Sequence, residues 1–212
     1  MNTVQVKNTV IGEGRPKICV PIVGKTKTDI LEEAKKITTL PVDVVEWRVD
    51  WFDDVFATEK VLETAKELQE VLKDIPVLLT FRTSKEGGEK EFSVNDYAAL
   101  NIAAAQSGYV DLIDVEAFTG DEVVKTIINA AHEAGVKVIA SNHDFSDISR
   151  VADSSVITSC LQVGITAILG ISAPSSCIMQ RRRMISSFSG VLKKSWLEAG
   201  CYHTAVCHSG NV

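Results

Sequence analysis

Residues 136–145 read VKVIASNHDF, an apolar run that ends in small polar residues and a histidine. The run Val136–Ala140 is typical of a buried strand, so His143 would lie just beyond the carboxyl end of that strand. α/β enzymes carry their catalytic groups at this end of their strands. The stretch therefore predicts an α/β fold with His143 in its functional site.

The residues before this stretch repeat one alternation of short apolar runs and helical patterns. We expect strands over 17–24, 42–49, 76–81, 109–115 and 136–140, and helices over 28–37, 58–72, 95–105 and 121–134. Strands separated by helices of this length pair in parallel through right-handed crossovers. Ahead of them, Val4–Val6 and Thr9–Ile11 alternate apolar and polar residues, which predicts a two-stranded ribbon that plugs one end of a barrel.

The length of the chain limits the choice of α/β fold. A (β/α)8 barrel takes about 250 residues in the typical case, and three more units would need more than the 67 residues that follow residue 145. A doubly wound sheet is the alternative. However, Gly24-Lys25-Thr26 after the first strand lacks the further glycines of a nucleotide-binding turn.

Composition indicates in which compartment the protein works and which class of molecule it binds. The chain is 212 residues long, 45% hydrophobic and has a net charge of −6, so it offers no basic face for nucleic acid and small molecules are the expected partners. A secretory leader is absent from the amino-terminal pattern, which predicts a cytoplasmic protein. An odd number of irregularly spaced cysteines predicts reduced thiols: Cys19, Cys160, Cys177, Cys201 and Cys207.

Composition also changes near residue 146. Residues 146–212 hold six Lys and Arg against three Asp and Glu, a net charge of +3, whereas the first 145 residues hold 16 against 25, a net charge of −9. The same tail holds four of the five cysteines and thirteen serines. We predict two parts, a barrel part over 1–145 and an atypical tail over 146–212.

The composition of the tail has several possible explanations. A reading-frame shift near residue 146 explains the loss of acids and of the βα rhythm, and a diverged, non-catalytic variant of the barrel is the alternative. The uncharged residues 154–180 precede three arginines, as in a membrane span, but their Ser, Thr, Gln and Pro content argues against one. Cys201, His203, Cys207 and His208 match the spacing of no zinc module, so we predict no metal site.

Charged residues at the carboxyl ends of the expected strands form the candidate site. Because alternate residues of a strand face the same side, Glu46, Arg48 and Asp50 share one face, as do Asp114 and Glu116. Buried charges must be paired or functional. A structural ion network is therefore one interpretation, and a ligand site is the other.

Two arginines, Arg48 and Arg82, favour the ligand site, since guanidinium groups bind carboxylates in bidentate fashion. We expect a small anionic ligand. His143 is a candidate general base, with Asp144 or Asp114 as the carboxylate that orients its ring.

Five stretches resemble the type I 3-dehydroquinate dehydratase family: GEGRPKICVPIVGKT (12–26), DVVEWRVDWF (43–52), LLTFRTSKEGGE (78–89), DLIDVEAF (111–118) and KVIASNHDF (137–145). The resemblance implies an incomplete (β/α)8 TIM barrel with an N-terminal β-hairpin, usually a homodimer, without metal or cofactor. It also implies a lyase of the shikimate pathway of aromatic amino acid biosynthesis. Such a lyase dehydrates 3-dehydroquinate to 3-dehydroshikimate through a Schiff base with a lysine.

Carried over residue by residue, the resemblance implies a role for each candidate. Glu46, Arg48 and Arg82 would bind the carboxylate and hydroxyls of the substrate. His143 would be the general acid and base, Glu86 the acid beside it and Asp114 the group that orients the imidazole. A base with a pKa near neutrality can take the proton next to the carbonyl and return one to the departing hydroxide.

The chain departs from the family where the imine-forming lysine is expected. Position 170 is a glycine within ITAILGISAP, and the sequence has no lysine between Lys137 and Lys193. A late substrate-binding arginine and a Ser/Gln loop are also missing. The alternative function is therefore a catalytically inactive remnant of the same fold that binds small anions.

Overall fold

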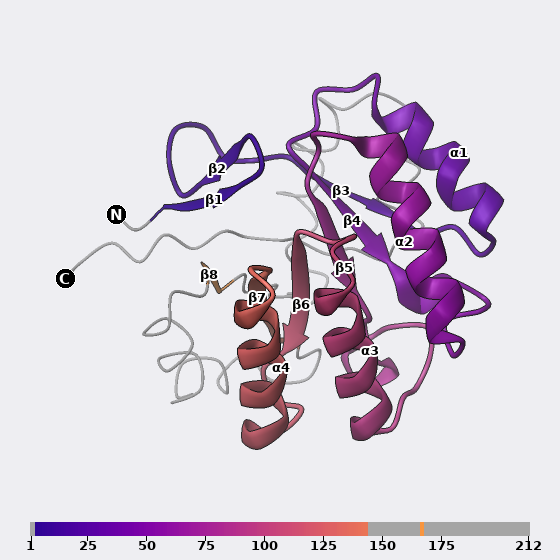
Figure 1. Ribbon diagram of the computed structural model, residues 1–212, viewed down its shortest axis with the longest axis vertical. Coiled ribbons are helices and arrows are strands. Elements are labelled where there is room, and N and C mark those ends of the chain that lie inside the picture. Colours follow the sequence, from indigo (N-terminus) through magenta and orange to yellow (C-terminus); the bar gives the residue numbers. More distant parts are fainter. Residues whose placement is uncertain (1–2, 144–165, 168–212) are drawn as a thin grey trace, which may run out of the picture.

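The computed structural model of the protein describes residues 3–143 and 166–167, which form a hairpin and a parallel sheet with helices packed along its outer face (Figure 1). The hairpin pairs β1 (Val4–Val6) with β2 (Thr9–Ile11). The sheet runs in chain order: β3 (Cys19–Ile22), β4 (Val44–Arg48), β5 (Val77–Thr80), β6 (Leu112–Glu116), β7 (Lys137–Ser141) and β8 (Thr166–Ala167). Each neighbouring pair is parallel.

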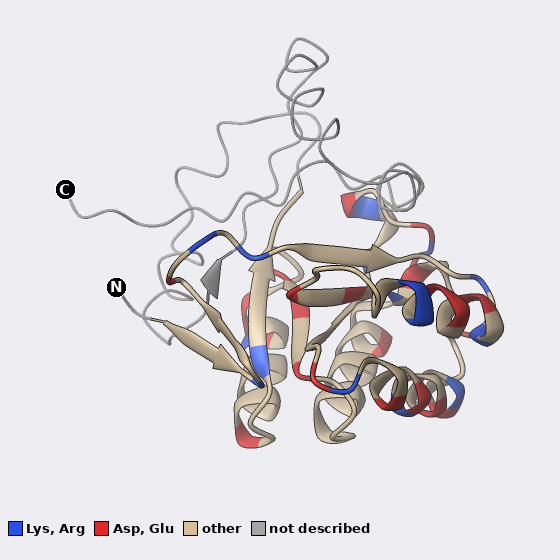
Figure 2. Ribbon diagram, turned by 90° about the horizontal axis from the view of Figure 1, so that it is seen from above, with Lys and Arg blue, Asp and Glu red and all other residues tan. Residues whose placement is uncertain are grey.

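Four helices connect the strands: α1 (Lys27–Ile37), α2 (Thr58–Leu72), α3 (Val94–Gln106) and α4 (Asp121–Glu133). The start of α1 is fixed by a capping box, in which the Thr26 side chain accepts from the Asp29 amide and the Asp29 side chain accepts from the Thr26 amide. Ser93 caps α3 in the same position. Charged residues lie mainly on the helices and turns, and the strands are largely uncharged (Figure 2).

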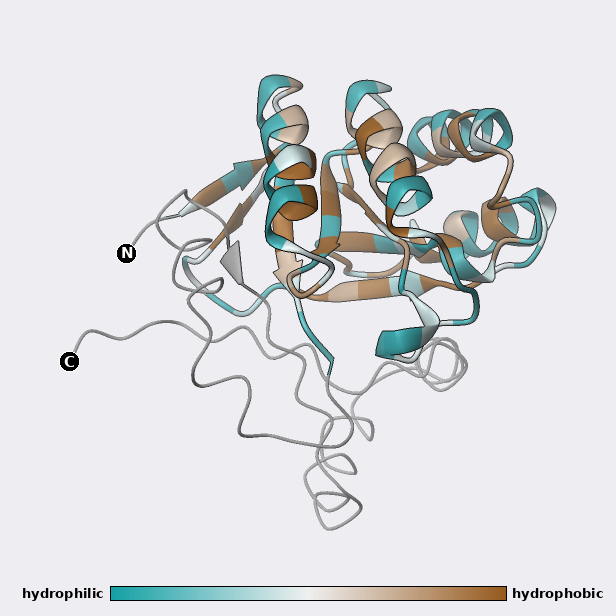
Figure 3. Cartoon of the chain, turned by 90° about the horizontal axis from the view of Figure 1, so that it is seen from below, coloured by the Kyte–Doolittle hydropathy of each residue, from teal (hydrophilic) through white to brown (hydrophobic). Residues whose placement is uncertain are grey.

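The outer face of the sheet supplies the main hydrophobic core. Trp47, Leu79 and Phe81 are fully buried there against apolar residues of the helices, and Figure 3 shows hydrophobic residues on the strands and on the helix faces toward them. Each such side chain contributes about 1.5–3 kcal/mol on burial. This packing holds the strands so that every second residue points to the inner side of the curved sheet.

The hairpin packs across the amino-terminal ends of the strands. Val6 belongs to a separate apolar cluster with Val44, Leu78, Leu112 and Ile139. Lys7 Nζ lies 2.9 Å from Asp111 Oδ2 and donates to the carbonyl of Lys73 at 2.9 Å. The predicted two-stranded ribbon is confirmed, and its role as the plug of a barrel stays a prediction.

All five predicted strands differ from the observed ones by one to three residues at their ends, and two of these differences have local reasons. The strand expected from Tyr109 begins at Leu112, because the Asp111 side chain accepts from the Val77 amide at 2.8 Å and pairs with Lys7. Asp111 therefore lies at the hairpin end of β6 and not among the site residues. The strand expected to reach Val49 ends at Arg48, where the 3-10 turn η1 (Val49–Trp51) begins.

The tail contains one feature that its sequence did not predict. Thr166 and Ala167 form β8, which pairs in parallel with Ile139 and Ala140 of β7 and so adds a sixth strand. Asp144, the uncharged segment 154–180 apart from Thr166 and Ala167, and the Cys/His group 201–208 lie outside the described residues. The division at residue 146 stays a prediction.

Among the described helices, none has the length and apolar character that a membrane span requires.

Candidate functional site

The inner face of the sheet changes from apolar to charged along β4, β5 and β6. On β5 and the residues that follow it, Leu78 belongs to the hairpin-end cluster, Thr80 is fully buried and Arg82 is 6% exposed. On β6 the same alternation gives Leu112, Asp114 and Glu116. Alternate residues of a strand share a face, so the strands bring their last inward residues together at the carboxyl end.

Arg82 is the centre of this charged cluster. Its Nη2 lies 3.0 Å from Asp114 Oδ1, and its Nη1 lies 3.1 Å from Glu116 Oε1, 2.9 Å from Ser141 Oγ and 3.4 Å from Glu86 Oε2. Burial lowers the pKa of Arg82, but the carboxylates of Asp114, Glu116 and Glu86 outweigh it and the pKa is raised overall. The guanidinium is therefore a permanent cation among three acids, two from β6 and one from the turn that carries Glu86.

Arg48 makes a second buried ion pair beside it. Its Nε and Nη2 each donate to one carboxylate oxygen of Asp50 at 2.8 Å, in a bidentate arrangement. Asp50 is fully buried in η1, and its Oδ1 also accepts from the Arg82 amide at 3.4 Å. Asp50 thus reaches the inner face through a 3-10 turn and not through the strand alternation used to place it from sequence.

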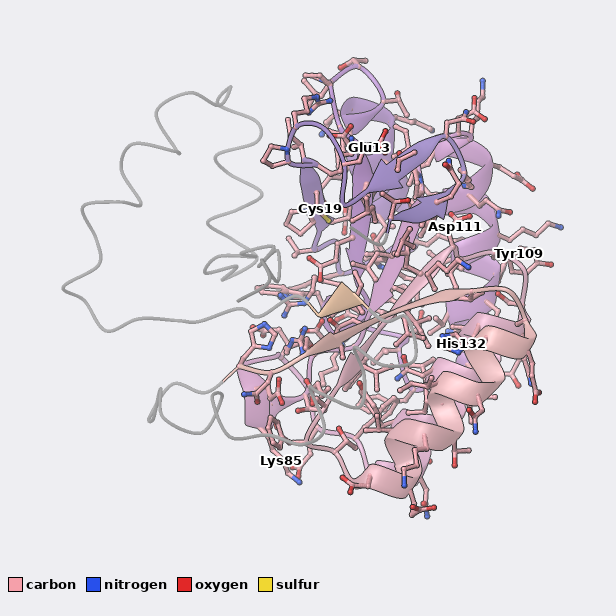
Figure 4. All side chains as sticks on the ribbon, turned by 90° about the vertical axis from the view of Figure 1, so that its left-hand side faces the viewer. Glu13, Cys19, Lys85, Tyr109, Asp111 and His132 are labelled. Atoms are coloured by element: carbon pink, nitrogen blue, oxygen red, sulfur yellow. The ribbon has the colours of Figure 1, made fainter. Side chains whose placement is uncertain are left out.

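The turn η2 (Ser84–Glu86) brings Glu86 to His143. Glu86 Oε2 accepts from the His143 amide at 3.0 Å and lies 3.0 Å from His143 Nδ1. Gly87 closes the turn with φ of +84°, and the Gly88 amide donates to the Thr83 carbonyl at 2.8 Å. Lys85, in the same turn, lies at the opposite end of the molecule from Asp111, where the hairpin docks (Figure 4).

The environment of His143 fixes its protonation and tautomer. The pKa of His143 is lowered to about 4, first by burial and then by Arg82 and Arg48, while Asp114 opposes the change. The ring is therefore neutral at pH 7. An ionised carboxylate only accepts hydrogen bonds, so the proton must be on Nδ1, facing Glu86, and the Nε2 lone pair is left as the base.

Two further carboxyls bind protons more readily than usual. Burial raises the pKa of Glu46, with Arg48 opposing. Burial also raises the pKa of Glu116 to about 7, again against an arginine, Arg82. The cluster can therefore hold neutral acids that donate hydrogen bonds as well as anions that accept them. Within the described residues, no group of three or more His, Cys, Asp and Glu side chains is arranged to hold a metal ion.

Comparison with known proteins agrees with this arrangement. A family model described as type I 3-dehydroquinase matches residues 18–163. The chain belongs to the type I 3-dehydroquinase family. The match extends beyond residue 145, where the resemblance read from the sequence ended.

Named relatives of the type I 3-dehydroquinase family are similar over the first two thirds of the chain. The 3-dehydroquinate dehydratase of Clostridium botulinum is 54% identical over 142 residues, which cover 67% of this chain and 56% of the relative. That of Salmonella choleraesuis is 51% identical over 145 residues, 68% of this chain and 58% of the relative. The chain thus spans a little over half the length of these relatives.

A solved type I 3-dehydroquinate dehydratase confirms the barrel class. The structure from Clostridium difficile has a TM-score of 0.76 and 46% identity, and the similarity covers 80% of this chain and 68% of that one. The Enterococcus faecalis structure gives a TM-score of 0.73 with 35% identity over 88% of this chain and 81% of that one. The predicted α/β fold of the TIM-barrel family is therefore correct.

All six site residues predicted from the sequence lie in one cluster. Direct contacts join Arg82 to Glu86 and Asp114, and Glu86 to His143. Arg48 and Glu46 lie close enough for the charge of Arg48 to lower the pKa of Glu46. The orienting role of Asp114 stays a prediction: its carboxylate pairs with Arg82 and Ser141, and Glu86 is the acid on the imidazole.

The sequence left four residues of the cluster without a role: Asp50, Thr83, Glu116 and Ser141. Asp50 and Glu116 continue the alternation of charges that marked Arg48 and Asp114, so their position was a usable signal. Thr83 and Ser141 carry no such signal, since single hydroxyl residues are common near strand ends. Only the fold shows that they bind Glu116 and Asp114.

Opposite pKa changes predict opposite effects of pH on stability. The pKa of His143 is lowered from 6.5 to about 4, so the stability it contributes is present above pH 6.5 and lost as the pH falls through 4. The pKa of Glu116 is raised from 4.5 to about 7, so its contribution is present below pH 4.5 and lost as the pH rises through 7. We expect His143→Gln to abolish an acid-side loss of about 2 kcal/mol. Urea unfolding at pH 7 and pH 5 tests this, and equal pH slopes for both proteins would contradict it.

Proposed function

We propose that this chain is a hydro-lyase that converts 3-dehydroquinate to 3-dehydroshikimate through a Schiff base. One observation carries the proposal: His143 is a neutral imidazole whose Nδ1–H is held by Glu86 at the carboxyl end of the barrel strands, beside two buried arginines. Neutral imidazole is the form that removes a proton, and the nearby cations suit an anionic substrate.

His143 would act first as base and then as acid. Its Nε2 takes the proton next to the imine carbon, and the electron pair moves toward the protonated imine. The resulting imidazolium then gives its proton to the departing hydroxide, which leaves as water. The sequence predicts a pKa near neutrality for this group, whereas burial and Arg82 bring it to about 4. An anionic substrate adds negative charge beside the ring and would raise this pKa on binding.

The other predicted residues would hold the substrate. Arg48 and Arg82 supply guanidinium donors, and both already face carboxylates, which keep them ordered. Glu46, whose pKa burial raises, would form a hydrogen bond with a substrate hydroxyl. These roles are part of the proposal, and they explain why the inner face is charged at one end only.

The proposed reaction needs a lysine as the nucleophile that forms the imine. Imine formation needs an uncharged amine, yet position 170 is glycine and no lysine occurs between Lys137 and Lys193. This observation favours a second candidate function, the binding of small anions by a catalytically inactive remnant.

Borohydride trapping separates the two functions. We expect the full chain, incubated with 3-dehydroquinate and sodium borohydride, to gain the mass of one reduced substrate adduct on a lysine, as read by intact-protein and peptide mass spectrometry. Omitting borohydride is the control. Saturable binding of 3-dehydroquinate by calorimetry without an adduct would establish the binding function instead, and neither signal would reject both.

Assembly and location belong to the same proposal. By analogy with its family, the chain would form a homodimer and act in the cytoplasm on the shikimate pathway toward aromatic amino acids. Sedimentation equilibrium of the full chain at micromolar concentration tests the dimer, and a single species of 23.0 kDa would reject it.

A further inference from the structure

Glu116 holds a central place in the cluster, although no step of the proposed reaction uses it. Its Oε1 accepts from the Thr83 amide at 2.9 Å and from Arg82 Nη1 at 3.1 Å, and its Oε2 accepts from Thr83 Oγ1 at 2.8 Å. Glu116 is 3% exposed and is therefore shielded from solvent. One carboxylate therefore fixes both the Arg82 guanidinium and the residue that starts the next turn.

Thr83 passes this constraint to Glu86. The Thr83 carbonyl accepts from the amides of Glu86 at 3.0 Å and Gly88 at 2.8 Å, so it anchors both ends of the turn that carries Glu86. Glu86 in turn holds the amide and Nδ1 of His143. A continuous series of hydrogen bonds thus leads from Glu116 to the imidazole.

Arg82 provides a second connection, in which Glu116 and Glu86 compete. Nη1 carries two hydrogens and has three acceptors, of which Glu86 Oε2 is the most distant at 3.4 Å. That same Glu86 oxygen accepts from His143. If Glu116 lost its charge, Arg82 would pair more strongly with Glu86 and draw this oxygen away from the ring.

From these contacts we infer that Glu116 is a positioning residue: its carboxylate occupies Arg82 and Thr83 so that Glu86 remains on Nδ1 of His143 and keeps Nε2 free as the base. It does not touch the reacting atoms and acts through its neighbours. That His143 is the base rests on the proposed function, whereas the contacts between Glu116 and the imidazole do not.

The surroundings of Glu116 place its change of charge near neutral pH. Burial raises its pKa to about 7, Arg82 opposes this, Glu86 adds to it and the Thr83 donors oppose it. The other titratable groups around it are Asp114 on its own strand, Tyr97 of α3, whose hydroxyl accepts from the Glu116 amide at 2.9 Å, and His143 after β7. Lowering the pH through 7 should therefore have the same effect as removing the charge.

The inference is tested by the exchange with water of the proton on His143 Nδ1. This proton is observed by NMR on the full chain, and its signal is assigned by its loss in His143→Gln. In the native protein we expect a protected Nδ1–H at pH 8 and about tenfold faster exchange with water at pH 6, the loss expected for one hydrogen bond. Glu116→Gln should show the fast exchange at both pH values. Glu122→Gln, a carboxylate with 89% side-chain exposure on α4, is the matched control and should behave like the native chain.

A second variant covers the case in which Glu116→Gln does not fold. Thr83→Val removes the donor to Glu116 Oε2 but keeps the amide donor to Oε1. Because that donor lowers the pKa of Glu116, the transition in exchange should move to higher pH. An unchanged transition in Thr83→Val, or one that persists in Glu116→Gln, would overturn the inference. Since neither readout needs turnover, a negative borohydride result leaves this test intact.

Discussion

Arg82→Met should lower the free energy of unfolding by about 4 kcal/mol, because it leaves buried carboxylates without their cation. Methionine keeps most of the apolar stem, so the loss reports the charge. Glu86, Asp114 and Glu116 would then be three acids at close range with no guanidinium between them. Urea unfolding at pH 7 followed by circular dichroism measures the effect.

The pH dependence of this variant gives an internal check. Without Arg82 the carboxyl pKa values must rise, so the variant should recover stability as the pH falls and the acids become neutral. Arg15→Met is the matched control: Arg15 pairs with Asp43 at 3.0 Å, but its side chain is 61% exposed, and we expect a loss below about 0.5 kcal/mol. Similar losses in the two variants would show that Arg82 does not hold the cluster together.

Gly88→Ala should cost at least about 3 kcal/mol, at the upper end of what overpacking produces. A Cβ on Gly88 would lie 1.9 Å from the carbonyl oxygen and 2.5 Å from the carbonyl carbon of Arg82. Both are backbone atoms and cannot move aside as a flexible side chain would. The turn would have to open, and Glu86 would move away from His143.

Gly135→Ala separates this steric effect from backbone strain. Gly135 has φ of +78° and open space around its Cβ position, so alanine there should cost only about 1 kcal/mol. We also expect Gly88→Ala alone to remove the protected Nδ1–H signal of His143. Equal melting temperatures for the two variants would contradict the steric explanation.

The repeating elements were predictable because local chemistry determines them. The hairpin strands Val4–Val6 and Thr9–Ile11 and the helix Thr58–Leu72 have the bounds that side-chain periodicity predicted. Those patterns depend only on which residues face the core. Strand ends were less predictable. Strand β6 begins only after Asp111, because the Asp111 side chain forms a salt bridge with Lys7, a residue distant in sequence.

The site was predictable as a set of residues but not as a set of pairs. Alternation along each strand showed that Arg48 and Asp114 share the inner side with other charges. Which acid meets which arginine depends on the stagger between strands, and Arg82 reaches Asp114 and Ser141 across two neighbouring strands. The burial that lowers the pKa of His143 to about 4 likewise arises only once the whole cluster is assembled.

The hairpin at the amino-terminal ends of the strands also bears on the order of assembly. It precedes the sheet in the chain, yet Lys7 binds the carbonyls of Lys73 and Ile75, which lie 66 and 68 residues later, and Val6 packs on Ile139. Contacts so distant in sequence form late in folding because of the loop entropy they cost. The docking of the hairpin must therefore wait until β7 has joined the sheet.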